Sequence, residues 1–181
     1  TTADAMEVID FFHNAAQPRY RATLMGGVPT NWRTSTGDSQ PGFGDVYRSF
    51  DVVSPWSVGR YNSEAGVVTF NQNYIQPDLV EADAAGKDYL PVVWPGFSWA
   101  NLKQDPGLFN AIPRDGGSFF ARQIYEAQVS GCDMLYVAMF DEVDESTAVF
   151  KAAATQAELT YSGNAGLATV VADATFTLRI T

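Results

Sequence analysis

One apolar run constrains the fold of this chain more than any other feature. From Met134 to Phe140 the sequence is Met-Leu-Tyr-Val-Ala-Met-Phe, with no charged or small polar residue. A strand of this kind has no solvent-facing side, which is typical of a parallel sheet covered on both faces. Strand-like runs alternate with helical patterns along most of the chain, so the sequence predicts an α/β fold with a parallel sheet.

Most of the expected strands end in a polar, aromatic loop that is followed by a helical pattern. We expect strands at residues 22–25, 51–54, 89–93 and 134–140. We expect helices at residues 2–14, 70–86, 118–130 and 147–159, with Pro77 at a first turn or a break and Gly86 as a C-cap. From Ala168 to Ile180 apolar and polar residues alternate instead, which predicts one or two half-exposed β-strands.

Charge and composition exclude several classes of partner. The formal net charge is −10, and an acidic surface repels nucleic-acid backbones and anionic lipid, so we expect neither as a partner. No apolar run approaches the roughly 20 residues of a membrane span. The lone Cys132 and the lone His13 leave no His/Cys metal cluster. We therefore expect no zinc site, and the preferred interpretation includes neither a metal nor a cofactor.

Aromatic and cationic side chains gather where predicted strands give way to loops. In a (β/α) barrel these loops converge on one face, where active sites lie. Flat rings beside charged and amide groups are what a sugar-binding cleft requires, because sugar C–H faces stack on rings and hydroxyls take fixed polar partners. The alternative is that the tryptophans belong to the rim of the core and touch no ligand. The residues concerned are Trp32, Arg33, Trp56, Arg60, Trp94, Trp99 and Arg114.

Four carboxylates lie within five residues, from Asp141 to Glu145, at the end of the strongest predicted strand. Cleavage of a glycoside needs a carboxyl pair, and crowded like charges raise at least one pKa, which suits a general acid. Two other interpretations stay open. Asp144 or Ser146 could cap a following helix. The oxygen-rich cluster could also hold calcium, although the spaced calcium-loop pattern is absent.

Five segments together resemble a known family, in one order along the chain. They are similar to the glycoside hydrolases of the family 71/99 type, which are (β/α)8 TIM barrels. The resemblance implies that same fold for this chain and runs from about residue 24 to residue 151. The segments are residues 25–33, 54–61, 89–99, 113–120 and 138–145.

The resemblance also implies roles for two glutamates. In family 99 the corresponding strand exit carries two glutamates three residues apart. By that pattern Glu142 matches the base that deprotonates the sugar 2-hydroxyl, and Glu145 matches the general acid at the departing oxygen. The family pattern has Trp and His between the glutamates and Gly after them, where this chain has Val143, Asp144 and Ser146. The residues expected to line the sugar cleft are Trp32, Arg33, Trp56, Arg60, Tyr61, Trp94, Trp99 and Arg114.

We therefore expect a secreted glycoside hydrolase, related to endo-α-mannosidases and mannanases, that acts on α-linked mannan or a related α-glycan. Its partner is an oligo- or polysaccharide. The alternative is a non-catalytic, lectin-like carbohydrate-binding protein on the same scaffold. Both need the aromatic cleft, but only hydrolysis needs both Glu142 and Glu145.

The chain is short for a closed barrel, which typically takes about 250 residues. Only four parallel strands are convincing in the sequence. We expect residues 1–158 to form a partial barrel with the glycan cleft and residues 159–181 to form a β-rich tail. A second chain or a missing N-terminal segment would then complete the barrel. The alternative is a rearranged α/β domain in which the tail covers one edge of the sheet.

Overall fold

A three-stranded parallel sheet forms the centre of the first of two compact units. The computed structural model describes residues 1–149. The first unit contains Thr1–Ser57, Phe70–Val92 and Ala127–Tyr136. In its sheet β2 lies between β1 and β3, with Met25 opposite Val52 and Val53 opposite Tyr89. The strands are β1 (Met25–Val28), β2 (Val52–Pro55) and β3 (Asp88–Tyr89).

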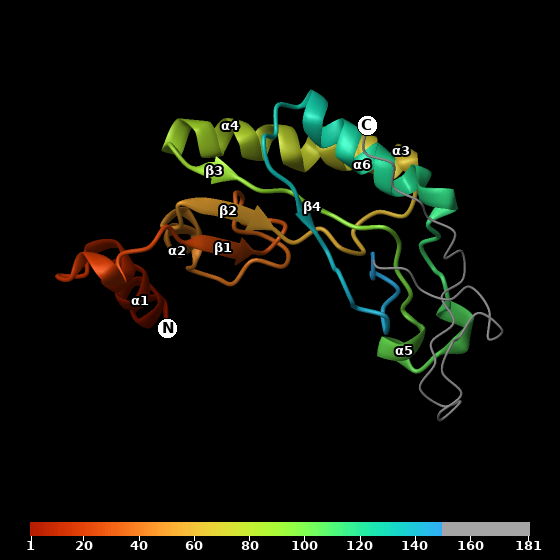
Figure 1. Cartoon of the computed structure of the whole chain (residues 1–181), viewed down its shortest axis with the longest axis horizontal. Helices are drawn as coiled ribbons and strands as arrows, with labels where there is room; N and C mark the ends of the chain where they lie inside the picture. The colour runs from red at the N-terminus through yellow and green to blue at the C-terminus, as the bar shows by residue number, and fades with distance from the viewer. Residues whose placement is uncertain (150–181) are drawn as a thin grey trace. The chain divides into compact units, whose positions relative to one another are not determined.

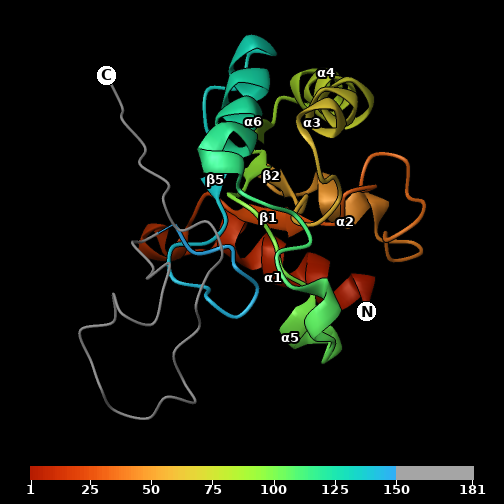
Figure 2. The same cartoon turned by 90° about the vertical axis from the view of Figure 1, so that its right-hand side faces the viewer.

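Helices flank this sheet on two sides. Figure 1 shows α4 running alongside β3, while both Figure 1 and Figure 2 show α1 on the β1 side, away from α4. Pro77 lies in the first turn of α4, and Gly86 ends that helix in the left-handed conformation with φ 63°, as the sequence predicts. The helical segments are α1 (Thr2–Asn14), η1 (Pro18–Tyr20), α2 (Gly44–Arg48), η2 (Asn71–Ile75) and α4 (Gln76–Ala85).

The core of the first unit is built where β1 and β2 meet the loops that follow them. Val28, Trp32, Tyr47 and Val53 are buried together. Gly26 in β1 is required by close packing, because a Cβ at this position would lie 2.1 Å from the ring of Phe50. Gly26 therefore lets the Phe50 ring lie directly against the strand. Because residues 26 and 27 are both glycine, the apolar run at residues 22–25 predicts the strand too early in the chain.

The second unit packs around a group of aromatic side chains. It contains Val58–Thr69, Val93–Glu126 and the described residues from Val137 onward. Trp94 is fully buried, with ring centroids 5.0 Å from Phe119 and 6.4 Å from Phe97. The remaining elements of the chain are α3 (Glu64–Phe70), β4 (Val92–Val93), α5 (Ala100–Lys103), η3 (Pro106–Leu108), η4 (Asp115–Gly117), α6 (Ser118–Val129) and β5 (Tyr136–Val137).

The strand β5 pairs with β4 and is much shorter than its sequence indicates. Tyr136 N–H donates to Pro91 O, and Ala138 N–H donates to Val93 O, so both strands advance in the same direction. The expectation that residues 134–140 form a long strand covered on both faces is wrong. Val137 is 40% exposed and Phe140 is 70% exposed, so neither side chain is covered in the way that the apolar run predicts.

Other predicted boundaries also need correction. The strand expected at residues 89–93 is divided between β3 and β4, which belong to different sheets. The first strand begins at Met25 and not at residue 22. The helix predicted from residue 147 does not begin within the described residues, since Thr147 to Val149 are not helical. Instead the chain reverses, and Met139 N–H donates to Thr147 O while Val149 N–H donates to Met139 O. Residues 147–149 therefore pair with the backbone just after β5 and do not begin a helix.

The described residues form an α/β fold with parallel strands and helices, and they do not form a closed barrel. The expected boundary at residue 158 and the β-rich tail of residues 159–181 lie outside the described residues. Within residues 1–149 no helix has the length and apolar character needed to cross a bilayer.

Candidate functional site

The predicted carboxylate pair lies on a tight turn just after β5. Residues 143–146 form the turn, and Ser146 N–H donates to Val143 O at 3.1 Å. Ala148 N–H donates to Glu142 O at 2.8 Å, which closes the loop at its base. Glu142 and Glu145 are therefore carried by a hydrogen-bonded reversal of the chain, and no helix follows that Asp144 or Ser146 would cap in the described part of the chain.

The carboxylate of Glu142 is held by a buried hydroxyl. Thr147 Oγ1 donates to Glu142 Oε2 at 2.7 Å, and Thr147 itself is fully buried. A buried threonine has little rotational freedom because its β-branched side chain is fixed by packing. The hydrogen bond therefore orients the carboxylate through Oε2, and it leaves the second oxygen, Oε1, able to accept a proton or a hydrogen bond.

Glu145 lies in a different electrostatic environment on the same turn. Partial burial raises the pKa of the Glu145 carboxyl above its ordinary value, and the neighbouring Glu142 and Asp144 carboxylates raise that pKa further. Its backbone is fixed from a distant part of the sequence, because Ser98 N–H donates to Glu145 O at 2.8 Å. The turn thus carries one oriented carboxylate and one carboxyl biased toward its protonated form.

Arg114 lies underneath this turn and supports it. Its buried guanidinium donates from Nη2 to Ser146 O at 2.9 Å and to Ala148 O at 2.6 Å. The approach requires Gly96, since a Cβ there would lie 2.8 Å from Ile112 O and 2.9 Å from Arg114 Cγ. Arg114, expected at the surface of the sugar cleft, is placed by the structure where it holds the carboxylate turn.

Trp94 is packed inside the second unit, next to Tyr61. The two ring centroids are 5.3 Å apart, and Tyr61 is half-buried. Gln123 holds both residues, because its Nε2 donates to Trp94 O at 2.7 Å while its Oε1 accepts from Trp94 N–H and from the Tyr61 hydroxyl. Gln123 was not predicted as a site residue, because its place in a helical pattern gives no sign of this contact with a residue 29 positions away.

Trp99 and Arg60 lie nearer the surface of the second unit. Trp99 is half-buried, with its ring centroid 4.5 Å from that of Phe97 and Lys103 Nζ at 5.8 Å from its centroid. Gly59 passes close to the same indole, since a Cβ there would lie 3.1 Å from Trp99 Cζ2. Arg60 is exposed. Among the second unit's predicted tryptophans, Trp99 is therefore the one with an accessible ring.

The other three predicted cleft residues belong to the first unit. Trp32 is buried, and its Nε1 donates to Asp78 Oδ2 at 2.9 Å, while Arg33 Nε donates to Asp78 Oδ1 at 2.8 Å. Burial raises the pKa of Asp78, although the hydrogen bonds from Arg33 and Trp32 oppose this. Trp56 is 43% exposed. Asp78 was not predicted as a site residue, and it joins the loop after β1 to α4 through these hydrogen bonds.

Of the predicted site residues, the structure groups Glu142, Glu145 and Arg114 in one hydrogen-bonded element. Trp94 and Tyr61 form a packed pair, and Trp32 and Arg33 share one carboxylate in the other unit. Nowhere in residues 1–149 do three His, Cys, Asp or Glu side chains come together in a way that could hold a metal ion.

Comparison with known proteins gives a relationship of fold. No family model matches the sequence, and no curated protein matches it. Among solved structures, the chain is similar to the GH99 endo-alpha-mannosidase from Bacteroides thetaiotaomicron, with a TM-score of 0.59 and 15% identity over 82% of this chain. The structure of that enzyme in complex with BIS-TRIS-propane gives a TM-score of 0.50 and 15% identity over 77% of this chain. The chain spans 42% of that enzyme's length, so the scaffold is similar to a fragment of a glycosidase barrel.

Proposed function

We propose that this chain is the catalytic part of a glycoside hydrolase that acts on α-linked mannan or a related α-glycan. The observation that carries the proposal is that two glutamates on one turn lie in different environments. Glu142 accepts a hydrogen bond from a buried hydroxyl, and the pKa of Glu145 is raised by burial and by two adjacent carboxylates. A pair of carboxyl groups with different environments is what acid and base roles require. The fold similarity to a GH99 endo-alpha-mannosidase supports the substrate class.

In the proposed reaction Glu145 is the general acid and Glu142 is the general base. Glu142 takes the proton of the sugar 2-hydroxyl, and O2 bonds to C1 as the bond from C1 to the leaving oxygen breaks. Glu145 gives its proton to that leaving oxygen. In the second step Glu145 takes a proton from water, the water oxygen bonds to C1, and Glu142 returns its proton to O2 as the C1–O2 bond opens. The product keeps its anomeric configuration.

Arg114 supports the turn that carries both glutamates. Its guanidinium donates from Nη2 to the carbonyl oxygens of Ser146 and Ala148. These two hydrogen bonds hold the backbone that follows Glu145, and so help to position the carboxyl pair.

Cleavage of α-linked mannan oligosaccharides tests the proposal. The wild-type chain should release shorter sugars whose new reducing end has the α configuration when first formed, as followed by ¹H NMR. Glu142→Gln and Glu145→Gln should each lower kcat by about 10²–10⁴-fold, the usual worth of an acid or base group. Asp141→Asn is the matched control, because Asp141 is an exposed carboxylate one residue before Glu142. Binding without cleavage by the wild-type chain would support a carbohydrate-binding protein in place of a hydrolase.

We also propose that further polypeptide completes the barrel around these strands. The exposed apolar side chains of Val137 and Phe140 at the β5 exit support this, since a parallel strand normally has both faces covered. The similar enzyme is also longer, with 42% of its chain spanned here. Light scattering of the chain at low micromolar concentration should detect association, and a well-behaved 19.7 kDa monomer that cleaves glycan would contradict the proposal.

A further inference from the structure

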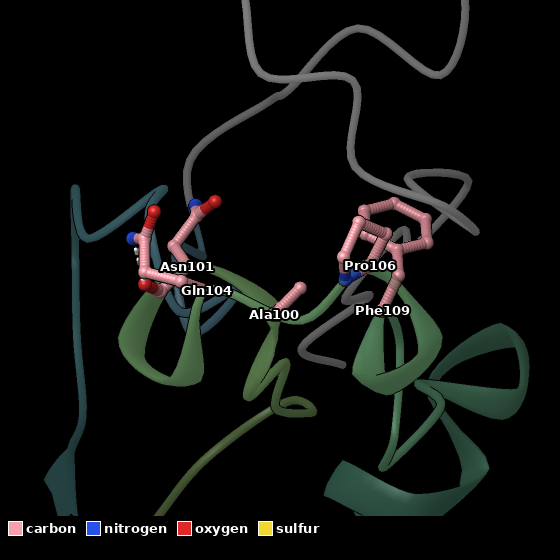
Figure 3. Close-up of a pocket in the computed structure, with 5 residues that line it drawn as sticks. All are labelled: Ala100, Asn101, Gln104, Pro106 and Phe109. Atoms are coloured by element: carbon pink, nitrogen blue, oxygen red, sulfur yellow. Dashed lines mark hydrogen bonds between the residues drawn. The ribbon is translucent and has the colours of Figure 1, made fainter.

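A surface hollow of about 490 Å³ lies on the second unit along α5 and η3. Figure 3 shows two opposed walls, with Asn101 and Gln104 on one side, Pro106 and Phe109 on the other, and Ala100 between them. The small side chain of Ala100 leaves the space between the walls open. Pockets that bind small ligands range over about 300–1,000 Å³, so this hollow has the size of a binding site.

The apolar wall carries an accessible aromatic ring on an ordered turn of the backbone. Phe109 is 46% exposed, although its backbone N–H donates to Pro106 O at 3.2 Å. The turn before it is fixed by Asp105, whose side chain accepts from Gly107 N–H at 2.9 Å. An accessible ring on an ordered turn can stack on an apolar ligand face, and the backbone that carries it needs little further ordering when a ligand binds.

The opposite wall is built from two amide side chains. Asn101 Nδ2 donates to Asp144 O at 2.8 Å, and Gln104 Nε2 donates to Asn101 O at 2.6 Å. Each of these side-chain amides uses one N–H in this way. Within residues 1–149 the side-chain oxygens of Asn101 and Gln104 accept no hydrogen bond. An amide holds up to four hydrogen bonds, so each wall residue keeps an acceptor and a donor in a fixed orientation.

This hollow is joined directly to the carboxylate turn. The hydrogen bond from Asn101 ends on Asp144, the residue before Glu145. Three residues earlier, Ser98 N–H donates to Glu145 O at 2.8 Å. The segment that carries the hollow and the turn that carries the carboxylates are thus held together within the second unit.

We propose that the hollow is a sugar subsite. In it a hexose of the glycan stacks on Phe109, and its hydroxyls form hydrogen bonds with the side-chain amides of Asn101 and Gln104. A pyranose has an apolar C–H face and a hydroxyl edge, and the two walls match these two surfaces. The inference rests on the proposed function for the identity of the glycan. It assigns the recognition of a neighbouring sugar unit to residues outside the set of tryptophans expected from the sequence.

Titration of the full-length ¹⁵N-labelled chain with a soluble α-linked mannan oligosaccharide tests the subsite. The backbone amide signals of residues 100–109 should shift, and Phe109→Ala should weaken binding by about tenfold, through loss of the stacking surface. Ala100→Phe fills the hollow and should weaken binding at least as much. Leu102→Ala is the matched control, because Leu102 is 55% exposed on the same helix but does not line the hollow.

The outcomes separate this inference from the proposed function. Binding that is lost in Phe109→Ala and Ala100→Phe but kept in Leu102→Ala supports the subsite, even where the wild-type chain cleaves nothing and the hydrolase proposal fails. Equal binding and cleavage by wild type, Phe109→Ala and Ala100→Phe would overturn the subsite and leave the hydrolase intact. Saturating glycan that shifts no amide signal of residues 100–109 would also overturn it.

Discussion

The hydroxyl of Thr147 donates a hydrogen bond to the carboxylate of Glu142, with 2.7 Å between Oγ1 and Oε2. Thr147 lies five residues after its partner, and the chain reversal at residues 143–146 brings the two side chains together. The donor is fully buried, whereas the carboxylate that it holds is only partly buried. One carboxylate of the proposed catalytic pair is therefore oriented by the fold before any ligand arrives.

Replacing Thr147 with valine should lower kcat about tenfold, because hydrogen bonds to charged groups are worth about 1.5–3 kcal/mol and only the orientation of Glu142 is lost. Valine keeps the shape of the side chain but has no donor. Steady-state kinetics should find KM nearly unchanged, and Thr147→Ser, which keeps the hydroxyl, should retain most of the activity. Unchanged kcat in Thr147→Val would show that this hydrogen bond does not position the base.

The pH dependence should report on the neighbours of Glu145. The Asp144 carboxylate contributes to the raised pKa of Glu145, so Asp144→Asn should lower that pKa. Since the proposed acid acts in its protonated form, the alkaline limb of kcat/KM should move to lower pH in this variant. A pH–rate profile from pH 4 to 9 measures the shift, and the Asp141→Asn profile is the control. An alkaline limb that moves to higher pH would contradict the role of Glu145 as the acid.

Asp78 should matter for stability more than its place on α4 suggests. Its buried carboxylate accepts hydrogen bonds from both Trp32 and Arg33. An asparagine at this position would turn its NH2 group toward one of these two N–H donors, and that hydrogen bond would be lost. Asp78→Asn should lower the free energy of unfolding by about 1–3 kcal/mol. Urea unfolding measures the loss, with Asp83→Asn, an exposed change on the same helix, as the control. Equal stability of the two variants would mean that Asp78 does not hold the loop after β1, which carries Trp32.

The two glycines of β1 provide a matched pair for the packing of the first unit. A Cβ on Gly26 would lie 2.1 Å from the Phe50 ring, whereas a Cβ on Gly27 would have no neighbour within 4 Å. Gly26→Ala should cost about 1–3 kcal/mol through overpacking. Gly27→Ala should be neutral or slightly stabilising, by up to about 1 kcal/mol, because it restricts the unfolded chain. Thermal unfolding of the two variants gives the comparison, and equal melting temperatures would contradict this packing.

Local signals in the sequence predicted the helices α1, α4 and α6 well. The bounds of α1 agree with the periodic pattern of residues 2–14. Gly86 ends α4 in the left-handed conformation, which glycine adopts more readily than other residues. The length of β5 was predicted poorly, since an apolar run reports which residues can be covered and not whether a neighbouring strand is there to pair with them.

The site depended on contacts that no local pattern carries. Trp32 and Asp78 are 46 residues apart, and Trp94 and Gln123 are 29 residues apart, so the burial of both tryptophans follows from long-range packing. The glutamate pair was visible as a cluster of like charges. Its two different environments were not visible, because they arise from the hydroxyl of Thr147 beyond the turn and from the partial burial of Glu145 in the folded chain.

The most direct test of the proposed acid and base is a comparison of two leaving groups. An α-mannoside with a nitrophenol leaving group needs no proton from an acid, whereas the natural glycosidic oxygen does. In the first turnover, Glu145→Gln should release nitrophenol at nearly the wild-type rate while failing to cleave an α-linked mannan oligosaccharide. Glu142→Gln should fail on both substrates. Loss of nitrophenol release in Glu145→Gln, or its retention in Glu142→Gln, would contradict the assignment of acid and base to this turn.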